Sequence, residues 1–112
     1  MAEFVYLYRG GMQPGSSPEQ MQQQMQRWVA WMKELGEKGH LKSHGHPLER
    51  TGKSVKGRDK TVTDGPYAEA KDLVGGYSLV EAKDLNHAVE LSRGCPIFNV
   101  DGSVEVRPIL SM

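Results

Sequence analysis

The most constraining feature of this 112-residue sequence is a run of five aromatic and aliphatic residues close to its start, Phe4-Val5-Tyr6-Leu7-Tyr8. Aromatic and branched residues favour strands, and neighbouring side chains of a strand point to opposite faces of its sheet. A strand that is apolar at consecutive positions therefore needs cover on both faces. The fold must place one layer on one side of this strand and a second layer on the other.

A helix supplies the first layer. We expect it to begin at Ser17-Pro18, because Ser17 and Gln20 have the spacing of a capping box and proline suits the first helical position. An apolar stripe with steps of three and four predicts the buried side, and Gly36 and Gly39 provide the stop. The stripe comprises Met21, Met25, Trp28, Met32 and Leu35.

The remaining pattern predicts short strands and a second helix. Strands are expected over 41–48, 61–63, 76–82 and 104–110, with a polar hairpin or exposed loop over 49–58. Asp64-Gly65-Pro66 should form a tight turn followed by a helical turn through Lys71, and Asp84 should cap a helix that Gly94 ends. The order β-α-β-β-α-β predicts a single α+β domain over residues 1–112, ferredoxin-like, with two helices on one face of an antiparallel sheet.

Two helices cover only one face of such a sheet, so the other face needs a partner. The simplest partner is a second copy of the same sheet, which predicts a homodimer with any site close to the covered face. Glu105 and Arg107 alternate with Val104 and Val106, so they should point away from the helices. There they would form a pair across the dimer or the polar lining of a cleft that binds substrate.

Composition excludes several classes of protein. Acidic and basic residues balance at 14 each, so no basic stripe predicts nucleic-acid binding, and no apolar run is long enough to cross a membrane. The start of the chain lacks the pattern of an export signal and Cys95 has no disulfide partner, so we expect a cytoplasmic protein. Gly75-Gly76 lacks the context of a phosphate loop, and we predict no cofactor.

Three histidines, His40, His44 and His46, form the most unusual local cluster. In a strand they would share a face, and His44 and His46 would lie about 7 Å apart at Cα, within reach of one metal ion. A metal site would also need a third ligand, so we assign no metal. Acid–base or substrate contact and a simple polar strand end are the other two readings.

Asp64, Tyr67 and Trp31 are the further candidates. The Asp64 carboxylate can hold its own turn, or it can orient a protonated histidine and act as a base. Tyr67 could place a phenol in the same cleft, although a half-buried core position also suits it. Trp31 lies at the edge of the helical stripe, where an aromatic side chain either covers the core margin or lines a pocket.

The segment from Val62 to Tyr77, which contains Asp64-Gly65-Pro66-Tyr67, resembles the signature of the DGPF branch of the YCII-related family. The similarity is strong from Thr61 to Ile109 and weaker over 4–48. It implies a dimeric ferredoxin-like α/β-barrel and kinship with small-molecule enzymes, in which a histidine on the first helix and a nearby aspartate form an acid–base pair. One type of member eliminates chloride from chlorinated aromatic intermediates.

The sequence departs from this family pattern at several positions. Trp28 stands where the helical histidine would align, Tyr67 replaces the usual phenylalanine, and Ala70 and Asp72 replace threonine and glutamate. Our hypothesis is a small-molecule enzyme, or a degenerate one, with proton transfer by His44 or His46 near Asp64 at the dimer cleft. The rival is a non-catalytic dimeric module that binds a small ligand or a regulatory protein. An alternative sigma factor is one such protein, because the resemblance implies an association between the DGPF branch and these factors.

Overall fold

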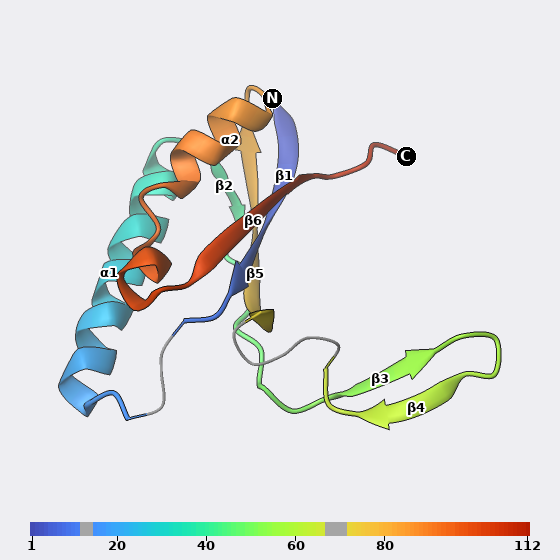
Figure 1. Ribbon diagram of the computed structural model, residues 1–112. Helices are drawn as coiled ribbons and strands as arrows, with labels where there is room; N and C mark the ends of the chain where they lie inside the picture. Colours follow the sequence, from blue (N-terminus) through green and yellow to red (C-terminus); the bar gives the residue numbers. More distant parts are fainter. Residues whose placement is uncertain (12–14, 67–71) are drawn as a thin grey trace.

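The computed structural model of the protein describes residues 1–11, 15–66 and 72–112. Figure 1 shows a sheet with two helices packed on one side and a hairpin that extends to the other side. The elements, in order along the chain, are β1 (Ala2–Arg9), α1 (Pro18–Glu37), β2 (Leu41–Ser43), β3 (Lys53–Lys56), β4 (Thr61–Asp64), β5 (Val74–Ala82), α2 (Leu85–Ser92), the 3-10 helix η2 (Pro96–Val100) and β6 (Ser103–Pro108).

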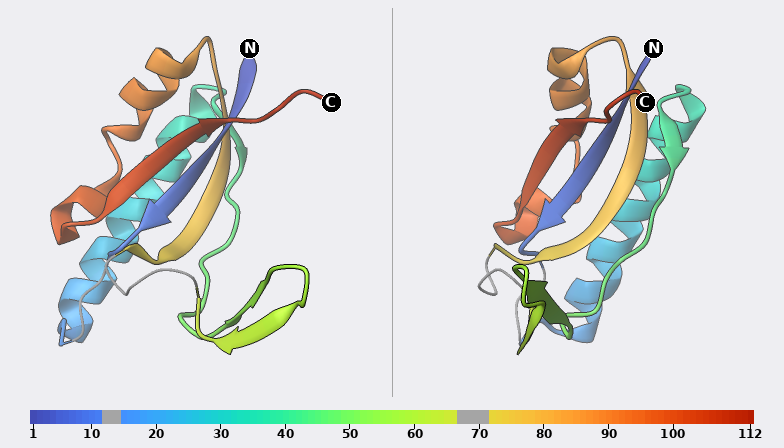
Figure 2. Two further views of the ribbon diagram at one scale, coloured as in Figure 1. Left: turned by 45° about the vertical axis from the view of Figure 1, so that its right-hand side comes forward. Right: turned by 90° about the vertical axis from the view of Figure 1, so that its right-hand side faces the viewer.

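The main sheet has the strand order β2-β5-β1-β6, and every neighbouring pair is antiparallel. This order, with both helices on one face, confirms the predicted ferredoxin-like α+β fold (Figure 2). The N-terminal strand β1 is central, because it pairs with β5 on one side and with β6 on the other. The sheet therefore joins the first strand of the chain to its last.

Burial along β1 alternates strictly. Phe4, Tyr6 and Tyr8 are buried beneath the helices, whereas the side chains between them are partly exposed on the opposite face. Val80 and Ala82 of β5 join the buried set from the neighbouring strand. The two-sided apolar character of this strand is thus real, but the helices cover only one of its sides.

The face of α1 that packs on the sheet differs from the predicted stripe. Its buried residues are Gln24, Trp31 and Leu35, while Met21 and Met25 are mostly exposed. Trp28 and Met32 lie between these sets and pack against the margin of the core. Trp31 stacks on Tyr6 at 6.2 Å, and the Gln24 amide donates to the Pro96 carbonyl at 2.7 Å; these two contacts fix the rotation of the helix.

The ends of the helices match the sequence signals. Ser17 and Gln20 form both bonds of the predicted capping box, and Asp84 accepts from the backbone N–H of His87 at the start of α2. The α2 helix lies over the sheet through Ala88, whose carbonyl accepts a hydrogen bond from the buried Tyr6 hydroxyl. Both helices are therefore fixed at their ends as well as by their packing.

Two of the predicted strands take other forms. The strand expected over 41–48 ends at Ser43, because Gly45 adopts a left-handed conformation with φ of +67°. The strand expected at 61–63 does not enter the main sheet; β4 pairs with β3 and forms a separate two-stranded hairpin. Figure 1 shows this hairpin projecting away from the helices.

The helical turn expected after Pro66 falls largely on residues 67–71, outside the described ranges, as does Tyr67. No helix in the described ranges is long and apolar enough to span a membrane.

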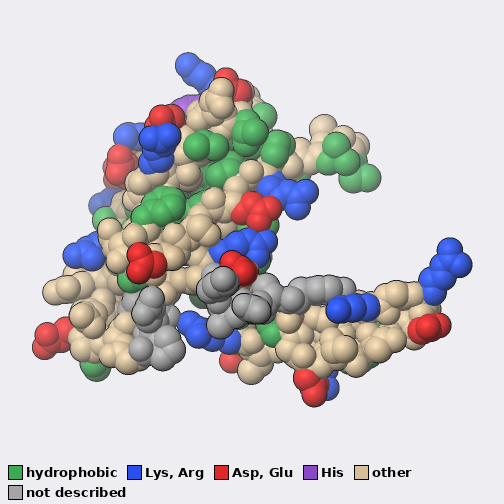
Figure 3. All heavy atoms as spheres, viewed as in Figure 1, with side chains coloured by type: hydrophobic (Ala, Val, Ile, Leu, Met, Phe, Trp, Pro, Cys, Tyr) green, Lys and Arg blue, Asp and Glu red, His purple; other side chains and the backbone are tan. Residues whose placement is uncertain are grey.

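We call the face of the main sheet away from the helices the open face. It consists of the odd-numbered positions of the three long strands: Glu3, Val5, Leu7, Arg9, Tyr77, Leu79, Glu81, Glu105 and Arg107. Its middle is apolar and its ends are charged. Figure 3 shows hydrophobic side chains gathered near the C-terminal tail, with a group of acidic and basic side chains just below them.

Candidate ligand-binding site

A cavity of about 450 Å³ lies at the lower end of the sheet, with the middle of α1 as one wall. Met25, Trp28 and Met32 face it from α1, and Ile97 and Val100 close it from η2. A volume of this size is at the lower end of the range for small-molecule sites. The sequence predicted a site near the face opposite the helices, whereas this cavity has a helix as its wall.

The segment after β2 forms the opposite wall and carries His44 and His46, both of which line the cavity. Gly45, between them, lies so close to β5 that a Cβ atom there would be 1.8 Å from the Tyr77 carbonyl oxygen. Gly76 allows the same close approach from the other strand, because it faces the backbone of His46 and Pro47. At Gly45 only glycine allows this packing, whereas at Gly76 an added Cβ would lie 3.1 Å from the His46 carbonyl oxygen, a tight contact.

Backbone hydrogen bonds hold the histidine segment in place. The Ser78 hydroxyl donates to the His44 carbonyl at 2.7 Å, and the Tyr77 N–H donates to the His46 carbonyl at 3.3 Å. The His46 ring lies edge-on to the Tyr77 ring, with 6.1 Å between their centroids. Both histidines are exposed, so they can meet both a ligand and water.

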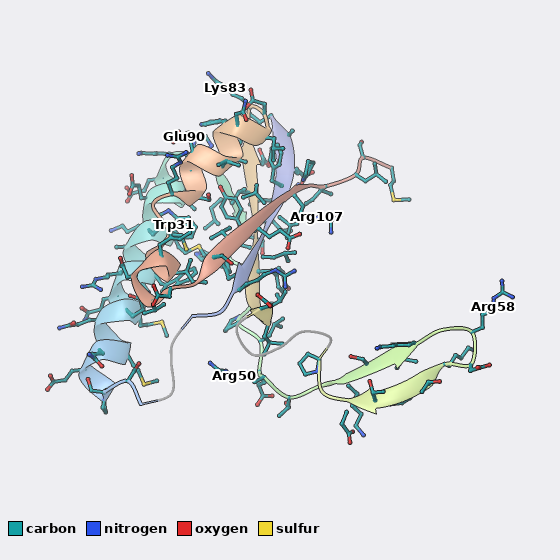
Figure 4. All side chains as sticks on the ribbon, in the orientation of Figure 1. Trp31, Arg50, Arg58, Lys83, Glu90 and Arg107 are labelled. Atoms are coloured by element: carbon teal, nitrogen blue, oxygen red, sulfur yellow. The ribbon has the colours of Figure 1, made fainter. Side chains whose placement is uncertain are left out.

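Tyr8 and Gln24 add polar groups to an otherwise apolar wall. Desolvation by burial is the largest effect on Tyr8 and raises the pKa of its phenol. The phenol therefore keeps its proton at any physiological pH. Arg50 is the charged residue among the described residues that line the cavity, and none of these is acidic. Figure 4 shows Arg50 below the end of the sheet, at the base of the hairpin.

Asp64 lies elsewhere. It ends β4, its side chain is 93% exposed, and it forms an ion pair with Lys53 of β3 at 3.3 Å. It is absent from the described lining of the cavity that holds His44 and His46. The expected meeting of the two segments assumed that β2 and β4 are neighbours, but β4 pairs only with β3.

His40 is separated from the other two histidines. Its Nδ1 lies 2.9 Å from the Glu81 carbonyl, and its ring is edge-on to His87 at 5.1 Å. Within the described ranges, no three His, Cys, Asp or Glu side chains are arranged to hold a metal ion. The left-handed Gly45 breaks the strand geometry on which the shared face of the three histidines was predicted.

Two other candidates lie away from the cavity. Trp31 is 6% exposed and belongs to the core, between α1 and the strands (Figure 4). Arg107 is on the open face, as its alternation predicted, 4.0 Å from Glu105. Glu105 forms its shorter ion pair with Arg9 at 2.8 Å, and Arg9 also donates to the Asp72 carbonyl. These residues stabilise the sheet and are not part of the cavity wall.

Sequence reasoning missed Tyr8, Gln24 and Ser78 as wall residues. Tyr8 was assigned only to an apolar strand, and Gln24 was assigned to neither face of the helix. Ser78 carried no signal beyond its place in a strand. Each faces the cavity only because elements distant in the sequence pack together, so periodicity within one segment could not identify them.

The fold defines a small ferredoxin-like α+β protein with a cavity at one end of its main sheet. The sequence matches the YCII-related domain over residues 5–112, and the chain therefore belongs to the YCII-related family.

Known proteins similar to this chain include an uncharacterised bacterial protein and an enzyme of solved structure. An uncharacterised protein, R00369, of Rhizobium meliloti (strain 1021) is 39% identical over 49 residues, which are 43% of this chain and 40% of that protein. The chain thus matches less than half the length of this curated relative. Among solved structures, 5-chloro-2-hydroxyhydroquinone dehydrochlorinase from Burkholderia phenoliruptrix AC1100, in complex with 2,5-dihydroxybenzoquinone, superimposes with a TM-score of 0.54. The match has 17% identity, covers 98% of this chain and 95% of that one, and shows a shared fold.

Proposed function

We propose that the protein binds a small molecule in the cavity and transfers a proton to or from it through His44 or His46. The observation that carries this proposal is that both imidazoles line one apolar cavity of ligand size. Imidazole is the side chain that most readily exchanges protons near neutral pH, and apolar walls strengthen its interactions with a bound molecule. The shared fold with a dehydrochlorinase supports an enzymatic role of this general kind.

Ligand screening by two-dimensional NMR tests the proposal. Ligands in the cavity are expected to shift the amide signals of Gly75 and Gly76 and the ring signals of both cavity histidines. His44→Gln and His46→Gln should weaken binding of such a ligand or abolish its turnover. His40→Gln is the matched control, because His40 lies outside the cavity. This substitution should leave ligand binding and turnover unchanged. Equal effects of all three variants would contradict the proposal.

Asp64 is proposed as a partner of these histidines in the working state, and its variant gives a separate test. Asp64→Asn keeps the shape of the side chain and removes the charge that Lys53 pairs with. A loss of affinity as large as that of His44→Gln would place Asp64 in the site. Unchanged affinity would limit its role to the hairpin.

A non-catalytic ligand-binding module is the second candidate, and one observation favours it. The described lining of the cavity contains no carboxylate to orient or relay a proton to the histidines. Under this alternative His44→Gln weakens binding, but no member of a metabolite library is converted by the wild-type protein. A regulatory partner such as a sigma factor would then respond to the ligand-bound form.

We further propose that the protein is a homodimer that covers the open face. Val5, Leu7 and Leu79 lie at its centre and are only partly buried. The radius of gyration is 15.5 Å, larger than the roughly 13 Å typical of a compact chain of this length. The hairpin contributes to the difference, because it projects on the side of the open face with Val55 and Val62 exposed (Figure 2). An isolated two-stranded hairpin is marginal in water, so a second copy would stabilise it.

A further inference from the structure

The Tyr8 hydroxyl is an exception among the buried polar groups. Tyr8 is 6% exposed, and its hydroxyl is the one buried side-chain donor or acceptor in the described ranges without a hydrogen-bond partner. Ser78 is near, but its hydroxyl proton goes to the His44 carbonyl and its oxygen does not meet the phenol in hydrogen-bond geometry. Buried polar groups without partners are rare and unfavourable, so each requires an explanation.

Tyr6, two residues earlier on the same face of β1, provides the comparison. Its hydroxyl donates to the Ala88 carbonyl, and it lies outside the cavity. Tyr8 lines the cavity, and the Trp28 ring stands edge-on to it at 4.8 Å. Two equivalent phenols therefore differ in one respect: the one without a partner belongs to the residue that lines the cavity.

The surroundings of Tyr8 indicate what kind of ligand could supply the missing hydrogen-bond partner of its hydroxyl. Trp28, Met25 and Met32 offer flat and polarizable surfaces that favour an aromatic ring. Because burial keeps the phenol protonated, Tyr8 would act as a neutral hydrogen-bond donor. The other polar groups on the wall, His44, His46 and Arg50, can donate hydrogen bonds to an anion, and no described lining residue is acidic.

We infer that the ligand is a small aromatic acid with a second, uncharged oxygen, and that the Tyr8 hydroxyl donates a hydrogen bond to this oxygen. The carboxylate of the ligand faces His44, His46 or Arg50. This inference rests on the proposed function and adds the chemical class of the ligand. Tyr8 is thus a specificity residue that selects ligands with an acceptor at the buried end.

Two acids of matched shape test the inference. The probes are 4-acetylbenzoate and 4-isopropylbenzoate, which share ring and charge but have a carbonyl oxygen or a methyl group at the same place. The wild-type protein should bind 4-acetylbenzoate about tenfold more tightly, because only that acid satisfies the phenol. Tyr8→Phe should remove this preference, since both acids then meet the same apolar ring.

Tyr6→Phe is the matched control. It should lower the denaturation midpoint, because it leaves the Ala88 carbonyl without its donor, yet retain the preference for 4-acetylbenzoate. Tyr8→Phe should keep or raise the midpoint, since it removes a group without a partner, so a loss of its preference would not reflect misfolding. NMR titration measures the affinities, and urea denaturation measures the midpoints.

The outcomes separate the two proposals. Equal affinities of the two acids for the wild-type protein would overturn the role of Tyr8 and leave the cavity as a ligand site. Retention of the preference by Tyr8→Phe would do the same. If neither acid binds, the aromatic-acid class is wrong, whereas the proposed function falls only if no ligand of any class shifts the cavity signals.

Discussion

At the scale of single residues, Gly45 holds the segment that carries both cavity histidines against β5. Any side chain there would overlap the Tyr77 carbonyl, and the φ of +67° is unfavourable for other residues. The bridge between Pro47 and Gly76 follows directly from this close approach. The position of both cavity histidines therefore depends on a residue that has no side chain.

Replacing Gly45 by alanine should lower the free energy of unfolding by about 2–3 kcal/mol, because strain and overlap act together. Gly36→Ala is the matched control. Gly36 is in α1 with no atom within 4 Å of an added Cβ, so alanine should stabilise the protein by about 0.5 kcal/mol through helix propensity. Urea denaturation measures both values. A Gly45→Ala variant as stable as the wild type would show that the segment is not held as described.

The buried thiol of Cys95 leads us to predict that the protein loses stability at high pH. The thiol is 3% exposed, and burial raises its pKa from 9.0 to about 12. The unfolded chain loses this proton above pH 9 while the folded protein keeps it, so stability falls as pH rises from 9 toward 12. The contribution of the thiol approaches about 1.4 kcal/mol per pH unit. The free energy of unfolding, measured in urea from pH 8 to 10.5, should fall less steeply for Cys95→Ala than for the wild type.

The sequence identified the two cavity histidines but not the polar groups around them. His44 and His46 are conspicuous because they are close in sequence, and both line the cavity. The phenol of Tyr8 and the amide of Gln24 gain their places from contacts made by η2 and β5, up to 72 residues away. Spacing within one segment contains no information about such contacts.

At the scale of elements, α1 shows how a polar residue can change the buried face of a helix. The predicted stripe omitted Gln24 because glutamine is polar, yet its hydrogen bond to the Pro96 carbonyl makes burial favourable. The helix is therefore rotated so that Trp31 packs on Tyr6, and Met21 and Met25 move toward the surface. Met25 and Trp28 are thereby available to the cavity.

This rotation predicts different roles for the two tryptophans. Trp31→Ala should lower the free energy of unfolding by about 3–5 kcal/mol, as expected for a buried aromatic, and Trp28→Ala by about half as much. Trp28→Ala should in addition weaken ligand binding, because Trp28 lines the cavity. Circular dichroism in urea measures stability, and NMR titration measures affinity. If Trp28→Ala lost more stability than Trp31→Ala, the buried face of α1 would be the one predicted from the sequence.

The helices, whose starts are marked by capping residues, were predicted closely. The pairing of the short strands was not. Ser17 and Asp84 mark their helices because capping depends on residues within one turn. The hairpin of β3 and β4 was not recognised as a separate sheet, because strand pairing is decided between segments and not within them. The alternation of Glu105 with Val104 and Val106 did assign the two faces of β6 correctly.

At the scale of the whole molecule, the open face predicts self-association. The wild-type protein should be a dimer at micromolar concentration. Leu79→Lys should give a monomer, because it places a charge at the apolar centre of the face, between β1 and β2. Sedimentation equilibrium measures the mass, and denaturation in urea establishes that the variant is folded.

Val29→Lys is the control for this prediction. Val29 is 60% exposed on α1, on the helical side of the molecule, so a lysine there should leave the mass of the wild-type dimer unchanged. A monomeric wild-type protein at micromolar concentration would contradict the proposed dimer. Equal dissociation by both variants would show that the open face is not the interface.

The central position of β1 also governs the order in which the protein can assemble during synthesis. Its residues 2–9 pair with 74–82 and with 103–108, so this strand has no partner until most of the domain has been translated. Contacts this distant in sequence slow folding, because a long loop must close before they form. The nascent chain therefore carries the exposed run Phe4 to Tyr8 through most of translation. The run is open to non-native contacts until the later strands arrive.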